Sequence, residues 1–153
     1  MSGYISAPPS RQYWARLSKI PGAGDARYEP QNVEAPKGSF LPNGDGARFA
    51  ELNDDSIFAD HVFTVPADTV DIDFTWKLTA PPHRTATFEY IAITADNTLL
   101  ASFDFHNTTP PSVVKHNVPL GGLTGRHTIL GRWNVADSPN AYYSAVDVLI
   151  EDS

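Results

Sequence analysis

The chain has 153 residues, of which 41% are hydrophobic and 19% charged. This is enough for one domain with a sizeable core, and it excludes an intrinsically disordered chain. The net charge of −7 argues against a nucleic-acid or membrane partner, because binding to anionic phosphates needs clustered Lys and Arg. Cysteine is absent, which excludes disulfides, thiol catalysis and cysteine zinc sites. We expect a single domain over residues 1–153 and a monomer.

The beginning of the chain gives little indication of where the protein works. Residues 1–14 lack the positively charged start and the apolar run of a signal peptide. No stretch is long and apolar enough for a membrane span. The chain as written predicts a cytoplasmic protein, with the mature domain of a secreted protein as the alternative, so the localisation stays open.

The first third of the chain predicts a long irregular region. Six of the 13 prolines and six of the 10 glycines stand there. They form turn signals such as Pro21-Gly22 and Pro42-Asn43-Gly44. We expect irregular loops from residue 2 to about residue 60, with one short helical turn around residues 47–52.

The rest of the chain predicts strands. In residues 69–79 apolar and polar side chains alternate, with Phe74 and Trp76 on the apolar side, which is typical of a half-buried strand. Phe88, Trp133 and Val146 are expected to join them in one core. The result is an all-β fold, an antiparallel sandwich of the immunoglobulin or fibronectin-III type. Its seven predicted strands are residues 61–66, 69–79, 85–94, 99–105, 113–118, 126–133 and 142–151.

Five segments along the chain carry a family resemblance. They are SGYISAPPSR (residues 2–11), YEPQNVE (28–34), FTWKLTA (74–80), ASFDF (101–105) and GRWNVADSPNAYYSAVDV (131–148). In this order they resemble the chitin-binding proteins that are lytic polysaccharide monooxygenases of the bacterial and viral type. The resemblance covers nearly the whole chain, and it implies a β-sandwich with a flat binding face.

The resemblance also implies a copper site. In the family, copper is held by the amine and imidazole of an N-terminal histidine and by one internal histidine, donors that suit Cu(II). By position, Ser2 replaces the first histidine and His116 is the remnant internal ligand. Tyr142 takes the axial place and Glu34 lies beside the site, so both have remnant catalytic roles. A serine hydroxyl is a poor ligand beside imidazole. We therefore expect no cofactor, and copper only if the site is functional.

These assignments have plainer alternatives. A lone strand histidine is more often hydrogen-bonded than a metal ligand, so the alternative for His116 is a hydrogen-bonded strand histidine. Glu34 is equally consistent with a solvated loop carboxylate. The other four histidines have no metal-ligand spacing, and we interpret them as ordinary surface or edge residues: His61, His83, His106 and His127.

The resemblance points to Tyr28 for carbohydrate. In relatives, an aromatic ring at this place stacks on the sugars of chitin, and polar side chains nearby bond the hydroxyl groups. Glu29, Gln31, Asn32 and Glu34 provide such groups in the same segment. The alternative is that Tyr28 covers a small core.

Three functions follow. The first is a chitin-binding module on a monooxygenase-like scaffold with a degraded copper site, a pseudo-enzyme whose partner is chitin or a related insoluble polysaccharide. The second is an active copper-dependent monooxygenase that cleaves chitin or cellulose, if the natural chain begins with His at the Ser2 position. The third is a toxin-associated or protein-interaction module. No nucleophile elbow, phosphate loop or His-Glu-x-x-His motif indicates another enzyme.

Overall fold

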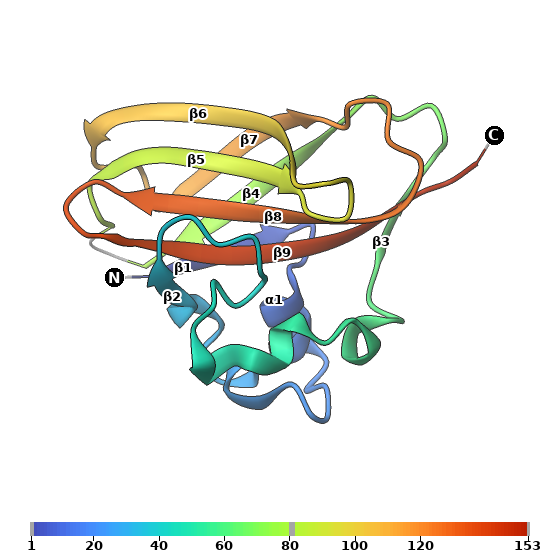
Figure 1. Ribbon diagram of the computed structural model, residues 1–153, viewed down its shortest axis with the longest axis horizontal. Helices are drawn as coiled ribbons and strands as arrows, with labels where there is room; N and C mark the ends of the chain where they lie inside the picture. The colour runs from blue at the N-terminus through green and yellow to red at the C-terminus, as the bar shows by residue number, and fades with distance from the viewer. Residues whose placement is uncertain (1, 80–81, 153) are drawn as a thin grey trace.

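The computed structural model describes residues 2–79 and 82–152, and it contains two β-sheets that enclose one core (Figure 1). One sheet has the strand order β1 (Gly3–Ala7), β4 (Asp71–Leu78), β7 (Val113–Pro119). The other has the order β2 (Glu34–Pro36), β9 (Asn140–Ile150), β8 (Gly125–Val135), β5 (Thr85–Ala92), β6 (Thr98–Thr108). A short strand, β3 (Phe63–Val65), pairs with β9 in parallel. The predicted all-β antiparallel sandwich is confirmed, with β3 as the parallel exception.

The core between the sheets follows from the alternation of side chains along each strand. Buried and non-buried residues alternate along β4, as the sequence pattern predicts. Phe74 and Trp76 from β4 meet Phe88, Trp133 and Val146 from the opposite sheet in one buried cluster. The Phe88 and Trp133 rings are stacked with their centroids 5.9 Å apart. The prediction that these five residues share one core is confirmed.

The first third of the chain is more regular than its turn signals predict. It contains the helix α1 (Arg11–Leu17) and four 3-10 helices: η1 (Gly24–Arg27), η2 (Pro30–Asn32), η3 (Ala47–Asn53) and η4 (Asp55–Phe58). The helical turn expected near residues 47–52 is η3. Neither β1 nor α1 was predicted, because such short elements show no reliable periodicity. Among the described residues, no helix combines the length and apolar character needed to cross a membrane.

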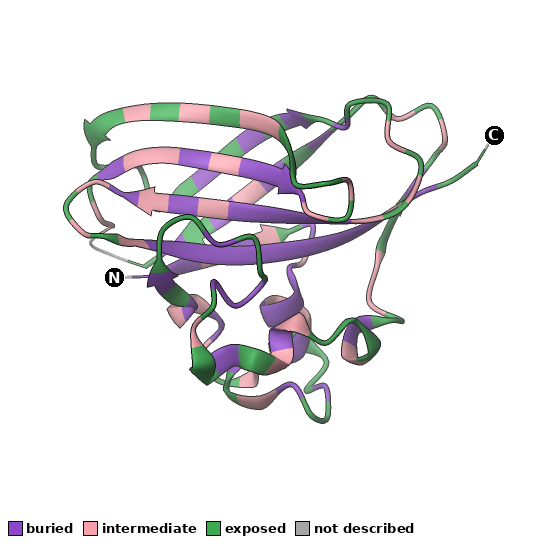
Figure 2. Cartoon of the chain, in the orientation of Figure 1, coloured by how far each residue is buried: buried purple, intermediate pink, exposed green. Residues whose placement is uncertain are grey.

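Strand β9 lies between two cores. Its side chains at Tyr142, Val146 and Val148 face the sandwich core. Those at Ala141 and Tyr143 belong to a second buried cluster that also contains apolar residues of the first third. Strand β9 is therefore buried along nearly its whole length (Figure 2). A strand buried on both faces is an almost continuous apolar run.

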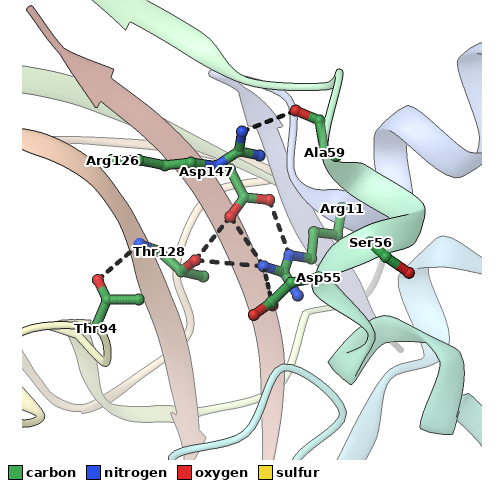
Figure 3. Close-up of a pocket in the computed structure, with 8 residues that line it drawn as sticks. All are labelled: Arg11, Asp55, Ser56, Ala59, Thr94, Arg126, Thr128 and Asp147. Atoms are coloured by element: carbon green, nitrogen blue, oxygen red, sulfur yellow. Dashed lines mark hydrogen bonds and ion pairs between the residues drawn. The ribbon is translucent and has the colours of Figure 1, made fainter.

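A buried ion pair holds the first third against β9 (Figure 3). Arg11 of α1 donates from Nε and Nη2 to both oxygens of Asp147, at 2.8 and 2.9 Å. Its Nη1 donates to the Leu52 carbonyl at 2.9 Å, and Thr128 Oγ1 donates to Asp147 at 2.7 Å. Arg11 and Asp147 are both almost fully buried. A buried charge is energetically costly unless it is paired and hydrogen-bonded, so these contacts are what stabilises the two charges inside the protein. The pair therefore sets the position of α1, and of the loops that follow it, on the sandwich.

Candidate functional site

Strand register brings Glu34 and Tyr142 together. Glu34 on β2 lies opposite Tyr142 on β9, which lies opposite Trp133 on β8. The Tyr142 ring stacks on Trp133 at 4.8 Å between centroids. Its hydroxyl donates to Glu34 Oε1 at 3.2 Å, while Asn140 Nδ2 donates to Glu34 Oε2 at 3.0 Å. Burial and the neighbouring Glu34 carboxylate raise the pKa of Tyr142, so the phenol remains neutral and serves as a donor.

His83, from the connection between β4 and β5, completes this group. Its Nε2 lies 3.2 Å from the Tyr142 hydroxyl, and its ring packs edge-on against Trp133 at 5.9 Å. Because the Tyr142 proton is donated to Glu34, the arrangement requires a proton on His83 Nε2. His83 Nδ1 lies 3.8 Å from the Asp137 carboxylate. His83, Tyr142, Glu34 and Asn140 thus form one hydrogen-bonded polar cluster. His83 is a member of this polar cluster and not an ordinary edge histidine.

The beginning of the chain lies close to the same cluster, next to Trp133. Gly3 is opposite Leu78 in the β1–β4 pair, so Ser2 lies beside Thr79. The Ser2 backbone nitrogen donates to Thr79 Oγ1 at 2.9 Å, and the two hydroxyl oxygens are 3.0 Å apart. A Cβ atom added to Gly3 would lie 3.2 Å from the Trp133 ring. The chain start, His83 and Tyr142 are thus grouped around Trp133.

His116 lies elsewhere. It is on β7 opposite Phe74, only 9% exposed, with its ring stacked on Phe103 at 3.9 Å. Its Nδ1 is 2.7 Å from the Tyr90 hydroxyl, and burial lowers the pKa of His116 to about 4.

The strand order separates this histidine from the Tyr142 cluster. The register row runs from Tyr142 through Trp133 and Phe88 to Phe103. Neighbouring strands lie about 4.8 Å apart, so Phe103 is three strands away from Tyr142. The structure does not bring His116 to Glu34 and Tyr142, and it corresponds to the alternative interpretation of a hydrogen-bonded strand histidine.

One signal in the sequence could have identified His83. The pairing of β1 with β4 places the chain start at the carboxyl end of β4. The connection that follows β4 must then lie near Ser2, and His83 is the histidine in that connection. The pairing itself was the missing information, because β1 was not predicted.

The predicted carbohydrate-binding residues divide into separate groups. Tyr28 is 65% exposed, so it does not cover a core. Gln31 lines a surface hollow close by. Glu29 forms an ion pair with Arg48 and accepts a hydrogen bond from Asn32 Nδ2 at 3.2 Å, so these groups already bond within the protein. Glu34 belongs to the Tyr142 cluster.

The donors around Trp133 do not fit the copper site that the resemblance implies. That site needs three nitrogens, and His83 supplies one imidazole. The Ser2 nitrogen donates to Thr79 Oγ1, and the Ser2 side chain provides a hydroxyl in place of the second imidazole. Across residues 2–79 and 82–152, no group of three or more His, Cys, Asp or Glu side chains could hold a metal ion.

Comparison with known proteins identifies the class to which this fold and site belong. The solved structure of a lytic polysaccharide monooxygenase from Jonesia denitrificans superposes with a TM-score of 0.83 at 38% identity, covering 97% of this chain and 99% of that one. The family model described as lytic polysaccharide mono-oxygenase, cellulose-degrading, matches residues 3–148. The chain therefore belongs to the lytic polysaccharide monooxygenase family.

Particular relatives carry a narrower description. A lytic chitin monooxygenase from Streptomyces ambofaciens is 46% identical over 146 residues, which cover 95% of this chain and 80% of the relative. Another lytic chitin monooxygenase, from Enterococcus faecalis, is 32% identical over 170 residues, with 97% and 85% covered.

Proposed function

We propose that this protein binds insoluble chitin through an exposed face on a monooxygenase scaffold whose copper site is degraded. The proposal is supported by the presence of an exposed aromatic ring together with the replacement of the first copper histidine. The ring of Tyr28 stands 65% exposed, while the place of the first copper histidine is occupied by Ser2, which is bonded to Thr79. An exposed aromatic ring for sugar stacking is therefore present, while the first copper histidine is replaced and His83 is the one imidazole left at the site. The names of two sequence relatives specify chitin.

The exposed tyrosine is held in position by two arginines. Arg16 Nη1 donates to the Tyr28 carbonyl at 3.2 Å, and the Arg27 guanidinium lies over the Tyr28 ring at 5.0 Å. A ring held in this way loses little conformational freedom when a ligand stacks on it. Its free face packs against the apolar face of a sugar, and Gln31 provides an amide for hydroxyl groups.

In this proposal the hydrogen bonds among His83, Tyr142 and Glu34 hold neighbouring segments of the chain in place. These hydrogen bonds connect β2, β9 and the β4–β5 connection. They hold the end of the sandwich where the chain begins. In a complete copper site the family's chemistry would take place here, and the cluster is what this chain retains of it.

The decisive experiment is a pull-down on insoluble β-chitin with Tyr28→Ala. Loss of one stacked ring removes on the order of 1–3 kcal/mol, by analogy with stacking on nucleic-acid bases, so we expect roughly tenfold weaker retention. The free energy of unfolding should change by less than about 0.5 kcal/mol, because the residue is exposed. The matched control is Phe63→Ala, an aromatic 37% exposed on β3, which should leave retention unchanged. Equal losses in both variants would contradict the assignment of Tyr28.

A second candidate is an active copper-dependent monooxygenase, favoured by the 46% identity to a lytic chitin monooxygenase. Calorimetric titration of the metal-free protein with Cu(II) separates the two. We expect binding orders of magnitude weaker than in a variant that begins with a free histidine in place of Met1 and Ser2. Tight equimolar binding by the chain as written, abolished by His83→Ala, would favour the active enzyme.

The third function, a toxin-associated or protein-interaction module, corresponds to a different result of the same pull-down. If the protein is retained by neither chitin nor cellulose, the binding face serves a protein partner. Retention on chitin without release of oxidised oligosaccharides, when a reductant is supplied, supports the chitin-binding pseudo-enzyme.

A further inference from the structure

Two adjoining hollows beside Tyr28 form a basic groove. The first, of about 630 Å³, is lined by Arg16, Lys19, Arg27 and Tyr28. The second, of about 410 Å³, shares Arg16 and extends past Lys77; its remaining lining residues are Tyr4, Tyr13, Leu17, Pro30, Gln31 and Thr79. Because Thr79 bonds Ser2, the basic groove connects the exposed Tyr28 to the beginning of the chain.

The charge of the basic groove is opposite to that of the whole protein. The chain carries a net charge of −7, yet among the residues that the structure describes no acidic side chain lines either hollow. The two nearest acids in the sequence, Asp25 and Glu29, are paired with Arg48. Within the described residues, none of the groove's cations forms an ion pair: Arg16, Lys19, Arg27 and Lys77.

The cations of the basic groove keep donors available. A guanidinium has five N–H donors. Arg16 uses one for the Tyr28 carbonyl, and Arg27 uses one for the Gly24 carbonyl at 3.2 Å. These bonds orient the two guanidinium groups and leave the remaining donors for a ligand. The Lys19 side chain makes no hydrogen bond within the part of the chain that the structure describes, so its ammonium group is also available.

We propose that the basic groove binds carboxylate groups carried by a polysaccharide, so that this protein prefers acidic polysaccharides that also contain sugars for Tyr28 to stack on. Arginine pairs with carboxylates through two parallel hydrogen bonds. Alternating aromatic and cationic side chains along two joined hollows suit a polymer better than a single small anion. The negative charge of the rest of the molecule opposes nucleic acid. This inference rests on the proposed polysaccharide-binding function and names the substrate class within it.

The test compares retention of the whole protein on chitin and on partly carboxymethylated chitin. Measurements at about 0.1 M and about 1 M salt, where the Debye length is about 10 Å and about 3 Å, separate charge from stacking. We expect tighter binding to the carboxymethylated polymer at the lower salt, and equal binding to both polymers at the higher salt. The test variant is Lys19→Gln with Lys77→Gln, which removes two exposed cations of the basic groove and leaves Arg16 and Arg27, the two arginines that hold Tyr28, in place. It should lose roughly fivefold in affinity for the carboxymethylated polymer, since exposed ion pairs contribute modestly, and keep its affinity for chitin within twofold.

The matched control is Lys115→Gln with Arg84→Gln, which removes the same charges elsewhere. Lys115 pairs with Asp73, and Arg84 donates to the Asn107 carbonyl on β6. This control should keep the preference for the carboxymethylated polymer, and an equal loss in both variants would overturn the proposal. Salt-sensitive binding of single-stranded DNA that also depends on Lys19 and Lys77 would overturn it in favour of nucleic acid. Retention on chitin without preference would refute the groove alone, whereas no retention on any polysaccharide would refute the proposed function.

Discussion

The histidines show how much a residue's role depends on its surroundings. Each ring nitrogen of His83 has a polar neighbour: the Tyr142 hydroxyl lies at Nε2 and the Asp137 carboxylate lies near Nδ1. His116 is enclosed by the aromatic rings of Phe88 and Phe103, with Tyr90 as its hydrogen-bond partner. The same side chain therefore serves in the polar cluster in one case and in the core in the other.

We predict that His116 makes stability fall at acidic pH. Its pKa is lowered from 6.5 to about 4 by burial, so the folded state favours the neutral imidazole. The stabilisation is fully present above about pH 6.5 and is lost as the pH falls toward 4, because the unfolded chain takes up the proton first. Urea unfolding should show a loss of about 2–3 kcal/mol between about pH 7 and pH 4.5.

Two glutamine variants test this pH dependence. His116→Gln can still bond the Tyr90 hydroxyl but cannot titrate, so the loss of stability in this pH range should shrink by most of that amount. His106→Gln is the matched control, because His106 is 81% exposed, and it should keep the wild-type profile. If both variants give the wild-type profile, another group controls the acid transition.

Among the elements, β9 organises the molecule. It pairs with β8, β2 and β3, and its two faces contribute to both buried clusters. It also carries Tyr142 to the polar cluster and Asp147 to Arg11. Strand β9 therefore connects the first third of the chain, through Asp147, with the cluster of His83, Tyr142 and Glu34 at the end of the sandwich.

We predict that Arg11→Met destabilises the protein by about 3–5 kcal/mol, because it leaves the Asp147 carboxylate buried without its partner. The double variant Arg11→Met with Asp147→Leu removes both charges, and it should recover most of that loss in denaturant unfolding. Arg48→Met is the control, since the Arg48 pairs are exposed and should contribute no more than about 1 kcal/mol. Equal destabilisation by the single and double variants would mean that packing around Arg11, rather than charge, carries the effect.

At the scale of the whole molecule, the two buried clusters share strands β8 and β9. Ile129 and Tyr142 belong to the core between the two sheets. Their neighbours in sequence, Leu130 and Tyr143, belong to the second cluster, which contains the apolar residues of the first third. Neither cluster keeps its packing if these strands separate. The helices of the first third therefore depend on the sandwich for their stability, and the sandwich depends on them to cover its apolar outer face.

We predict a single cooperative unfolding transition for the 153 residues. Scanning calorimetry should give a calorimetric enthalpy equal to the van't Hoff enthalpy. Fluorescence, which reports Trp14 in the helical layer and Trp76 and Trp133 in the sandwich, should have the same midpoint as near-ultraviolet circular dichroism. Two separate transitions would show that the first third folds independently, and the expected single domain over residues 1–153 would be wrong.

The sequence alone was enough to predict the sandwich and its core. Period-2 alternation is a local pattern, and burying one face of each strand leaves few architectures. The family followed from segments in a constant order, which need no structure to compare. Glu34 and Tyr142 were also assigned to one place, and the structure shows them bonded.

Only the tertiary structure decided which histidine joins them. Glu34 and Tyr142 are separated by 108 residues, and Ser2 and Thr79 by 77. Their meeting depends on strand register, which no local pattern specifies. The same holds for the basic groove, because its cations are spread from Arg16 to Lys77 in a chain that is acidic overall. Composition averages charge over the whole chain, whereas the fold gathers a few cations around one exposed tyrosine.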